Sequence, residues 1–95
     1  SVVSIPQGAG FQQPGQVYYE PNLITVDVGK SVSWMNNDEQ VHTVTSGTPT
    51  SGPDGFFDSG IISARASFHQ TFSSAGTYDY YCIVHPWMLG TVIAE

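Results

Sequence analysis

The chain has 95 residues, of which 40% are hydrophobic, 13% aromatic and 11% charged. This composition is too apolar for a disordered chain, and the length predicts a single domain over residues 1–95 that is too small for a large enzyme. Two basic against eight acidic residues give a formal net charge of −6, which excludes a nucleic-acid partner. No stretch reaches the roughly 18 consecutive apolar residues that a transmembrane segment needs. The single cysteine excludes an internal disulfide and a four-cysteine metal site.

Short runs of valine, isoleucine, threonine, tyrosine and phenylalanine alternate with clusters of glycine, proline, serine and asparagine. This pattern predicts an all-β sandwich of seven short strands. In chain order the predicted strands are Val2–Ile5, Leu23–Val28, Ser31–Met35, Val41–Thr45, Ala66–Phe72, Thr77–Cys82 and Thr91–Ala94. The segments 7–15 and 46–60 are rich in turn residues, and we predict that both are loops.

Alternation along the strands predicts which side chains enter the core. The inward sets are Ile24, Val26 and Val28; Val32 and Trp34; Phe68 and Phe72; and Tyr78, Tyr80 and Cys82. We expect His69 to lie on a solvent-facing strand surface and Met35 to serve in packing.

Two further polar features have structural interpretations. Tyr78 is expected to make a backbone hydrogen bond like that of the tyrosine corner in β-sandwiches. Asp38 and Glu39 follow two asparagines but lack the regularly spaced oxygen ligands of a calcium loop, so we predict a solvated turn there.

The most informative segment holds Cys82, His85 and Met88 at spacings of three residues, at the end of a predicted strand. A thiolate, an imidazole and a thioether at this spacing can converge on one ion. His42 supplies a further ligand, because the alternation places it on the inward face with Val44 near one end of the sandwich. Two histidines, one cysteine and a weak methionine form the ligand set that selects copper in an electron-transfer site.

The segments that carry these residues resemble a known family. GTYDYYCIVHPWMLGTVIAE (76–95) and VGKSVSWMNNDEQVHTV (28–44) are similar to the corresponding regions of amicyanin and plastocyanin-like cupredoxins, and the resemblance covers most of 23–95. It implies an eight-stranded Greek-key sandwich with one mononuclear type 1 copper site. In that site His42, Cys82 and His85 would be the equatorial ligands and Met88 the weak axial one.

The chain departs from the family pattern beside the first histidine, where many members have proline before it and asparagine after it. Here these neighbours are Val41 and Thr43. In the family the asparagine side chain ties this segment to the cysteine loop, and its backbone N–H donates to the cysteine sulfur. Thr43 can still provide the N–H, but its shorter side chain leaves open a site whose loops are not bridged and which is therefore looser. The bulky Trp87 next to Met88 also leaves open an axial position without methionine.

The first function that these features support is electron transfer. The ring edge of His85 would be exposed through an apolar patch of Pro86, Trp87 and Met88, where a redox protein partner docks briefly. The negative net charge would steer this monomer toward a basic partner surface. The family resemblance and the copper–thiolate chemistry imply an extracytoplasmic location, in the periplasm or at the outer face of a membrane, with an anchor in a longer precursor as an alternative.

The second function is a redox reaction of a small ligand, such as nitric oxide, nitrite or dioxygen, at an open type 1 copper. A second catalytic copper is excluded within one chain, because His69 is the only histidine left for it. Copper carriage or storage is disfavoured, since methionine-rich and histidine-rich tracts are absent. Zinc would also fit two histidines and a cysteine, but it would be colourless and redox-silent.

Overall fold

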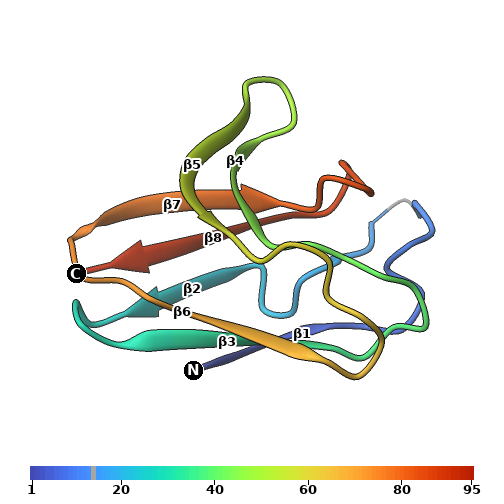
Figure 1. Cartoon of the computed structure of the whole chain (residues 1–95), viewed down its shortest axis with the longest axis horizontal. Coiled ribbons are helices and arrows are strands. Elements are labelled where there is room, and N and C mark those ends of the chain that lie inside the picture. The colour runs from blue at the N-terminus through green and yellow to red at the C-terminus, as the bar shows by residue number, and fades with distance from the viewer. Residues whose placement is uncertain (14) are drawn as a thin grey trace.

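The computed structural model describes residues 1–13 and 15–95, and within them eight strands form two sheets (Figure 1). The smaller sheet has the order β1–β3–β6, built from β1 (Val2–Ile5), β3 (Ser31–Asn36) and β6 (Ser67–Thr71). The larger sheet has the order β2–β8–β7–β4–β5, built from β2 (Leu23–Val26), β8 (Leu89–Ala94), β7 (Gly76–Tyr81), β4 (Thr45–Thr48) and β5 (Gly52–Asp58). The pairs β1–β3 and β2–β8 are parallel and the others antiparallel. The predicted all-β sandwich is confirmed.

Most predicted strands are confirmed to within one or two residues, and two regions differ. β2 ends at Val26, so Val28 lies in a turn and is 42% exposed, and its predicted place in the core is wrong. The predicted strand Val41–Thr45 is wrong except for Thr45, where β4 begins. His42 in that segment forms an isolated bridge with Ile62.

The segment 46–60, predicted as a loop, contains most of the β4–β5 hairpin, which projects from the larger sheet in Figure 1. Its glycines and prolines suggested a loop, but at Gly47 and Pro53 they fit the hairpin itself. Gly47 has a φ of 127° beside a register shift, a conformation that favours glycine. Pro53 lies in β5, which is an edge strand, and proline is tolerated in edge strands.

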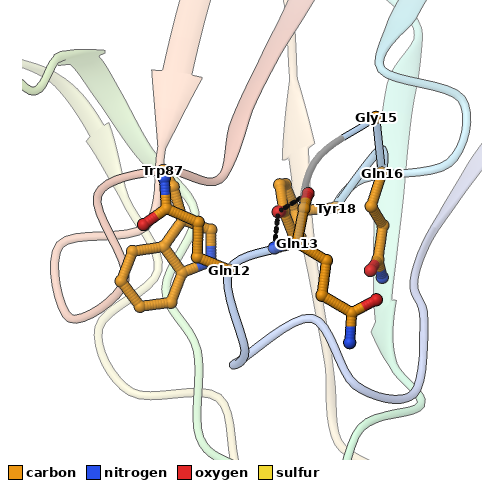
Figure 2. Close-up of a pocket in the computed structure, with 6 residues that line it drawn as sticks. All are labelled: Gln12, Gln13, Gly15, Gln16, Tyr18 and Trp87. Atoms are coloured by element: carbon orange, nitrogen blue, oxygen red, sulfur yellow. Dashed lines mark hydrogen bonds between the residues drawn. The ribbon is translucent and has the colours of Figure 1, made fainter.

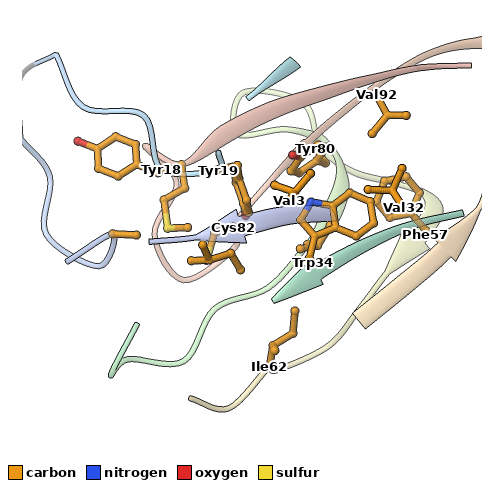
Figure 3. Packing of buried hydrophobic residues seen from close by; sticks show 14 of the residues in the cluster. Val3, Tyr18, Tyr19, Val32, Trp34, Phe57, Ile62, Tyr80, Cys82 and Val92 are labelled. Atoms are coloured by element: carbon orange, nitrogen blue, oxygen red, sulfur yellow. The ribbon is translucent and has the colours of Figure 1, made fainter. Parts of the chain in front are cut away.

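Side chains from both sheets meet around the buried Trp34 (Figure 3). The centre of its ring lies 5.3 Å from that of Tyr80 in an edge-on arrangement, and Tyr80 in turn lies 4.7 Å from Tyr19. Cys82 is fully buried and belongs to this cluster, at the end that also holds Tyr18 and Tyr19. The core therefore extends directly to the predicted metal ligand.

The structure tests three smaller predictions, which concern Tyr78, His69 and Met35. The Tyr78 hydroxyl donates to the Ser74 carbonyl at 2.6 Å, and His69 is exposed, so both predictions are confirmed. Met35 is 38% exposed, because it lies on the face of β3 opposite to Val32 and Trp34, and its predicted packing role is wrong.

Among the described residues, no helix has the length and apolar character that crossing a bilayer requires.

Candidate metal centre

His42 lies in the connection between β3 and β4, where backbone bonds in both directions join it to Ile62. The His42 N–H donates to the Ile62 carbonyl at 3.2 Å, and the Ile62 N–H donates back at 2.7 Å. His42 and Val44 are both fully buried, which confirms the predicted inward direction although the segment is not a strand. The bridge thus replaces a strand ladder in holding this histidine.

Cys82 follows the last residue of β7, and the segment from Cys82 to Met88, here called the copper loop, connects β7 to β8. Three backbone bonds close the copper loop: Cys82 N–H to Met88 O at 3.2 Å, His85 N–H to Cys82 O at 3.3 Å, and Met88 N–H to His85 O at 2.9 Å. Two consecutive turns therefore account for the spacing of three residues that the sequence shows.

Three donor atoms converge where the two segments meet. His42 Nδ1 and His85 Nδ1 are 3.1 Å apart, and Cys82 Sγ lies 3.9 Å from His42 Nδ1 and 3.6 Å from His85 Nδ1. These separations suit atoms that share one ion at distances of about 2.0–2.3 Å. His42 and Cys82 are buried and His85 is half-buried, so the site reaches the surface on the His85 side.

The proton on His42 is placed by Asp38, whose Oδ2 lies 2.6 Å from His42 Nε2. Burial raises the pKa of Asp38, but hydrogen bonds from the Gly8 N–H, His42, and the Glu39 and Gly10 N–H groups outweigh it and lower the pKa to about 2. The ionised carboxylate can only accept, so Nε2 carries a proton. Asp38 thus orients the His42 ring with Nδ1 directed at the other donors.

The predicted solvated turn is wrong for Asp38, which is 2% exposed. It is buried because the N-terminal segment passes over it, with the Gly8 and Gly10 N–H groups donating to its two carboxylate oxygens at 3.0 and 3.1 Å. Glu39 is exposed and forms an ion pair with Arg65 at 2.6 Å. The sequence carried no signal that would have separated the roles of these adjacent acidic residues.

The surroundings of the second histidine, His85, favour its neutral form. Burial lowers the pKa of His85, and the neighbouring His42 lowers it further, while the negative charge of Asp38 opposes them. A neutral imidazole offers its Nδ1 lone pair to a metal. The chemistry of the three donor groups therefore fits a copper ion.

Replacing Asp38 with asparagine should weaken metal binding by about 10- to 100-fold, because the charged partner that orients the His42 ring is lost. Titration against a competing chelator measures the change. Glu39→Gln is the matched control, since it neutralises the adjacent carboxylate at an exposed position. Equal affinities for the Asp38 variant and the control would show that the carboxylate does not prepare the ligand.

Thr43 connects the two ligand-bearing segments in two ways. Its backbone N–H donates to Cys82 Sγ at 3.3 Å, as predicted. Its Oγ1 accepts a hydrogen bond from the Ile83 N–H at 2.9 Å. The loops are therefore bridged, and the alternative of an unbridged site is wrong, because the hydroxyl needs to reach only the adjacent backbone.

Met88 is fully buried, so its predicted place in an exposed apolar patch is wrong. Trp87 is half-buried, its ring centre lies 5.3 Å from that of His85, and its Nε1–H donates to the Ala9 carbonyl at 3.2 Å. The indole is thus held against the N-terminal segment, and its bulk does not keep Met88 out of the interior.

A hollow of about 520 Å³ lies beside the copper loop (Figure 2). It is lined by Gln12, Gln13, Gly15, Gln16, Tyr18 and Trp87. The Tyr18 hydroxyl closes one side through bonds with the Gln13 N–H at 2.7 Å and the Gln13 carbonyl at 2.8 Å. The N-terminal segment therefore forms part of the surface around the site.

Comparison with known proteins places this geometry in a family. The chain is 30% identical to amicyanin of Paracoccus denitrificans over 95 residues, which cover 100% of this chain and 72% of that protein. It is 27% identical to plastocyanin of Scenedesmus fuscus over 88 residues, covering 85% of this chain and 90% of that protein.

Among solved structures, a purple cupredoxin from Nitrosopumilus maritimus matches with a TM-score of 0.92 at 28% identity, covering 100% of this chain and 99% of that one. A reduced tryptophan-to-tyrosine mutant of amicyanin matches with a TM-score of 0.77 at 29% identity, covering 100% of this chain and 81% of that one. Residues 9–95 match the profile of copper-binding proteins of the plastocyanin/azurin family. The chain is therefore a member of this copper-binding family, as the resemblance of its two segments predicted.

Proposed function

We propose that this type 1 copper protein carries single electrons on an ion held by His42, Cys82 and His85, with Met88 as the weak fourth ligand. The observation that carries the assignment is the convergence of the three donor atoms within 4.8 Å of one another. Copper bound there supplies a one-electron couple between copper(I) and copper(II). The full burial of Met88, at the end of the copper loop, supports its inclusion.

The residues around the site support fast transfer because they hold the donor atoms still. The His42 ring is fixed by Asp38, the Cys82 sulfur by the Thr43 N–H, and the copper loop by its own backbone bonds. Ligands that need not move between oxidation states keep the reorganisation small. His85 is the ligand through which the electron enters and leaves, since it is half-buried whereas His42 and Cys82 are buried.

A docking surface for a redox partner surrounds His85. The side chains next to the ligands in sequence are apolar and exposed, with Val41 at 43% and both Ile83 and Val84 at 45%. Pro86 is exposed as well. We assign these residues, together with His85 and Trp87, to the docking patch, and we exclude the buried Met88. A small apolar contact allows quick release, and the net charge of −6 favours a partner with a basic surface.

The chain is proposed to act as a single 1–95 domain, as a monomer, outside the cytoplasm. The match over residues 9–95 and the two sheets packed around one core support a single domain. A copper–thiolate site is vulnerable to exchange with cytoplasmic thiols, which favours the extracytoplasmic location.

Optical and electron paramagnetic resonance spectra of the copper(II)-loaded protein, recorded before and after addition of azide, test this function. We expect an intense visible thiolate band with narrow hyperfine splitting that azide leaves unchanged, and reversible one-electron reduction. Met88→Leu should shift both the band and the reduction potential, because the axial ligand tunes this site. Met35→Leu is the control, since Met35 is exposed on the smaller sheet.

A different pair of results would indicate an open copper site. A wild-type band that shifts or bleaches with azide, together with no effect of Met88→Leu, would show an open fourth position. The reaction of a small ligand at copper would then replace electron carriage as the function.

A further inference from the structure

We propose that Thr45 and Asp58, which lie outside the ligand set, are positioning residues of the copper site. They terminate a chain of hydroxyl hydrogen bonds that fixes the peptide after Cys82 by way of Thr43. The proposal rests on the role of Cys82 as a copper ligand. Its evidence is a continuous set of contacts that crosses the larger sheet from β5 to the end of β7.

The contacts run in one direction. The Ile83 N–H donates to Thr43 Oγ1 at 2.9 Å, Thr43 Oγ1 lies 3.0 Å from Thr45 Oγ1, and Thr45 Oγ1 donates to Asp58 Oδ1 at 3.0 Å. An ionised carboxylate only accepts, so the Thr45 proton points to Asp58 and Thr45 accepts the Thr43 proton. The Thr43 lone pairs are therefore directed at Ile83.

The strand register explains why Thr45 is the central link. In β4 it pairs with Asp58 of β5 on one side and with Tyr81 of β7 on the other. Tyr81 is the last residue of β7, directly before Cys82. The chain of hydrogen bonds thus ties the start of the copper loop to the edge strand of the sheet.

The hydrogen bonds of Thr43 and Thr45 matter because both side chains are buried. Thr43 is 4% exposed and Thr45 is fully buried, whereas Asp58 is exposed. If one hydroxyl is removed, the next has no water to replace its partner, so the Thr43 side chain loses the contact that sets its orientation. The charge on Asp58 strengthens the bonds that depend on it.

The chain of hydrogen bonds affects the metal site through the Cys82 thiolate. Thr43 holds Cys82 from two sides, with its N–H on the sulfur at 3.3 Å and its hydroxyl on the following peptide. A hydrogen bond to a ligand sulfur withdraws negative charge and favours the reduced metal. Loosening the chain should therefore weaken this bond and lower the reduction potential.

Thr45→Val removes the central hydroxyl at nearly constant volume, and two measurements follow its effect. In the metal-free protein, hydrogen exchange of the Ile83 amide should become about tenfold faster. In the copper-loaded protein, the equilibrium should shift toward copper(II) by up to about tenfold, which is about 59 mV for a one-electron couple. Thr45→Ser keeps the hydroxyl and should restore both values.

Thr77→Val in β7 is the matched control, since Thr77 is exposed and its hydroxyl makes no hydrogen bond with the described part of the chain. Asp58→Ala removes the acceptor at the surface and should act in the same direction, so it decides the matter if Thr45→Val does not fold. Unchanged Ile83 exchange, or faster exchange with an unchanged potential, would overturn the positioning role. A wild-type protein without a thiolate band would instead refute the proposed electron carrier.

Discussion

Replacing Cys82 with serine should abolish the intense visible absorption of the copper-loaded protein while leaving the sandwich folded. The thiolate is the group that gives the charge-transfer band, and a serine hydroxyl does not replace it. The fold should survive because the core around Trp34, Tyr80 and Tyr19 does not depend on the sulfur. A loss of stability below about 3 kcal/mol is expected from this one buried polar substitution.

The visible spectrum measures the first effect, and circular dichroism with thermal melting measures the second. His69→Gln is the control, because it removes the one histidine that lies exposed and away from the site, and it should keep the colour. A coloured Cys82→Ser protein would refute the assignment of Cys82 as the thiolate ligand.

Replacing Gly90 with alanine should lower the free energy of unfolding by about 3 kcal/mol, the upper part of the usual range for overpacking a core. Gly90 is buried opposite Tyr80 in the β7–β8 register, and an added Cβ would overlap the Tyr80 ring. That ring cannot move aside easily, because Trp34 and Tyr19 pack edge-on against it.

Urea denaturation of the metal-free protein measures this change as a lower midpoint. Gly10→Ala is the comparison, because its added methyl meets only the far end of the Gln40 side chain, which can rotate away. We expect that variant to lose less than about 1 kcal/mol. A Gly90→Ala protein as stable as the wild type would mean that the β7–β8 pair shifts to admit the methyl group.

Local pattern determined much of the strand arrangement. Strands such as β3 and β7 alternate between apolar and polar residues over most of their length, and alternation depends only on neighbours in the chain. Prediction from the local pattern failed where the composition of a segment is compatible with two structures. Glycine and proline in 46–60 are typical of loops, yet the same residues form a bulged hairpin and an edge strand.

For the metal site, too, some features followed from the sequence and others only from the tertiary structure. The sequence alone placed Cys82, His85 and Met88 on one short loop, which the structure closes by two consecutive turns of its own backbone. It identified His42 from its inward direction and from the family resemblance. Only the tertiary structure brought the His42 ring to the other donors, across 43 residues from His85.

The surroundings of the ligands were decided by tertiary structure as well. Asp38 became a buried partner of His42 because Gly8, 30 residues away in sequence, folds over it, and Thr43 bridges to a peptide 40 residues further on. Such contacts depend on how two sheets pack, which no spacing within a segment reveals. The candidate ligands and the Thr43 N–H could therefore be predicted from the sequence and its family resemblance, whereas the other groups that orient those residues appeared only when distant segments met.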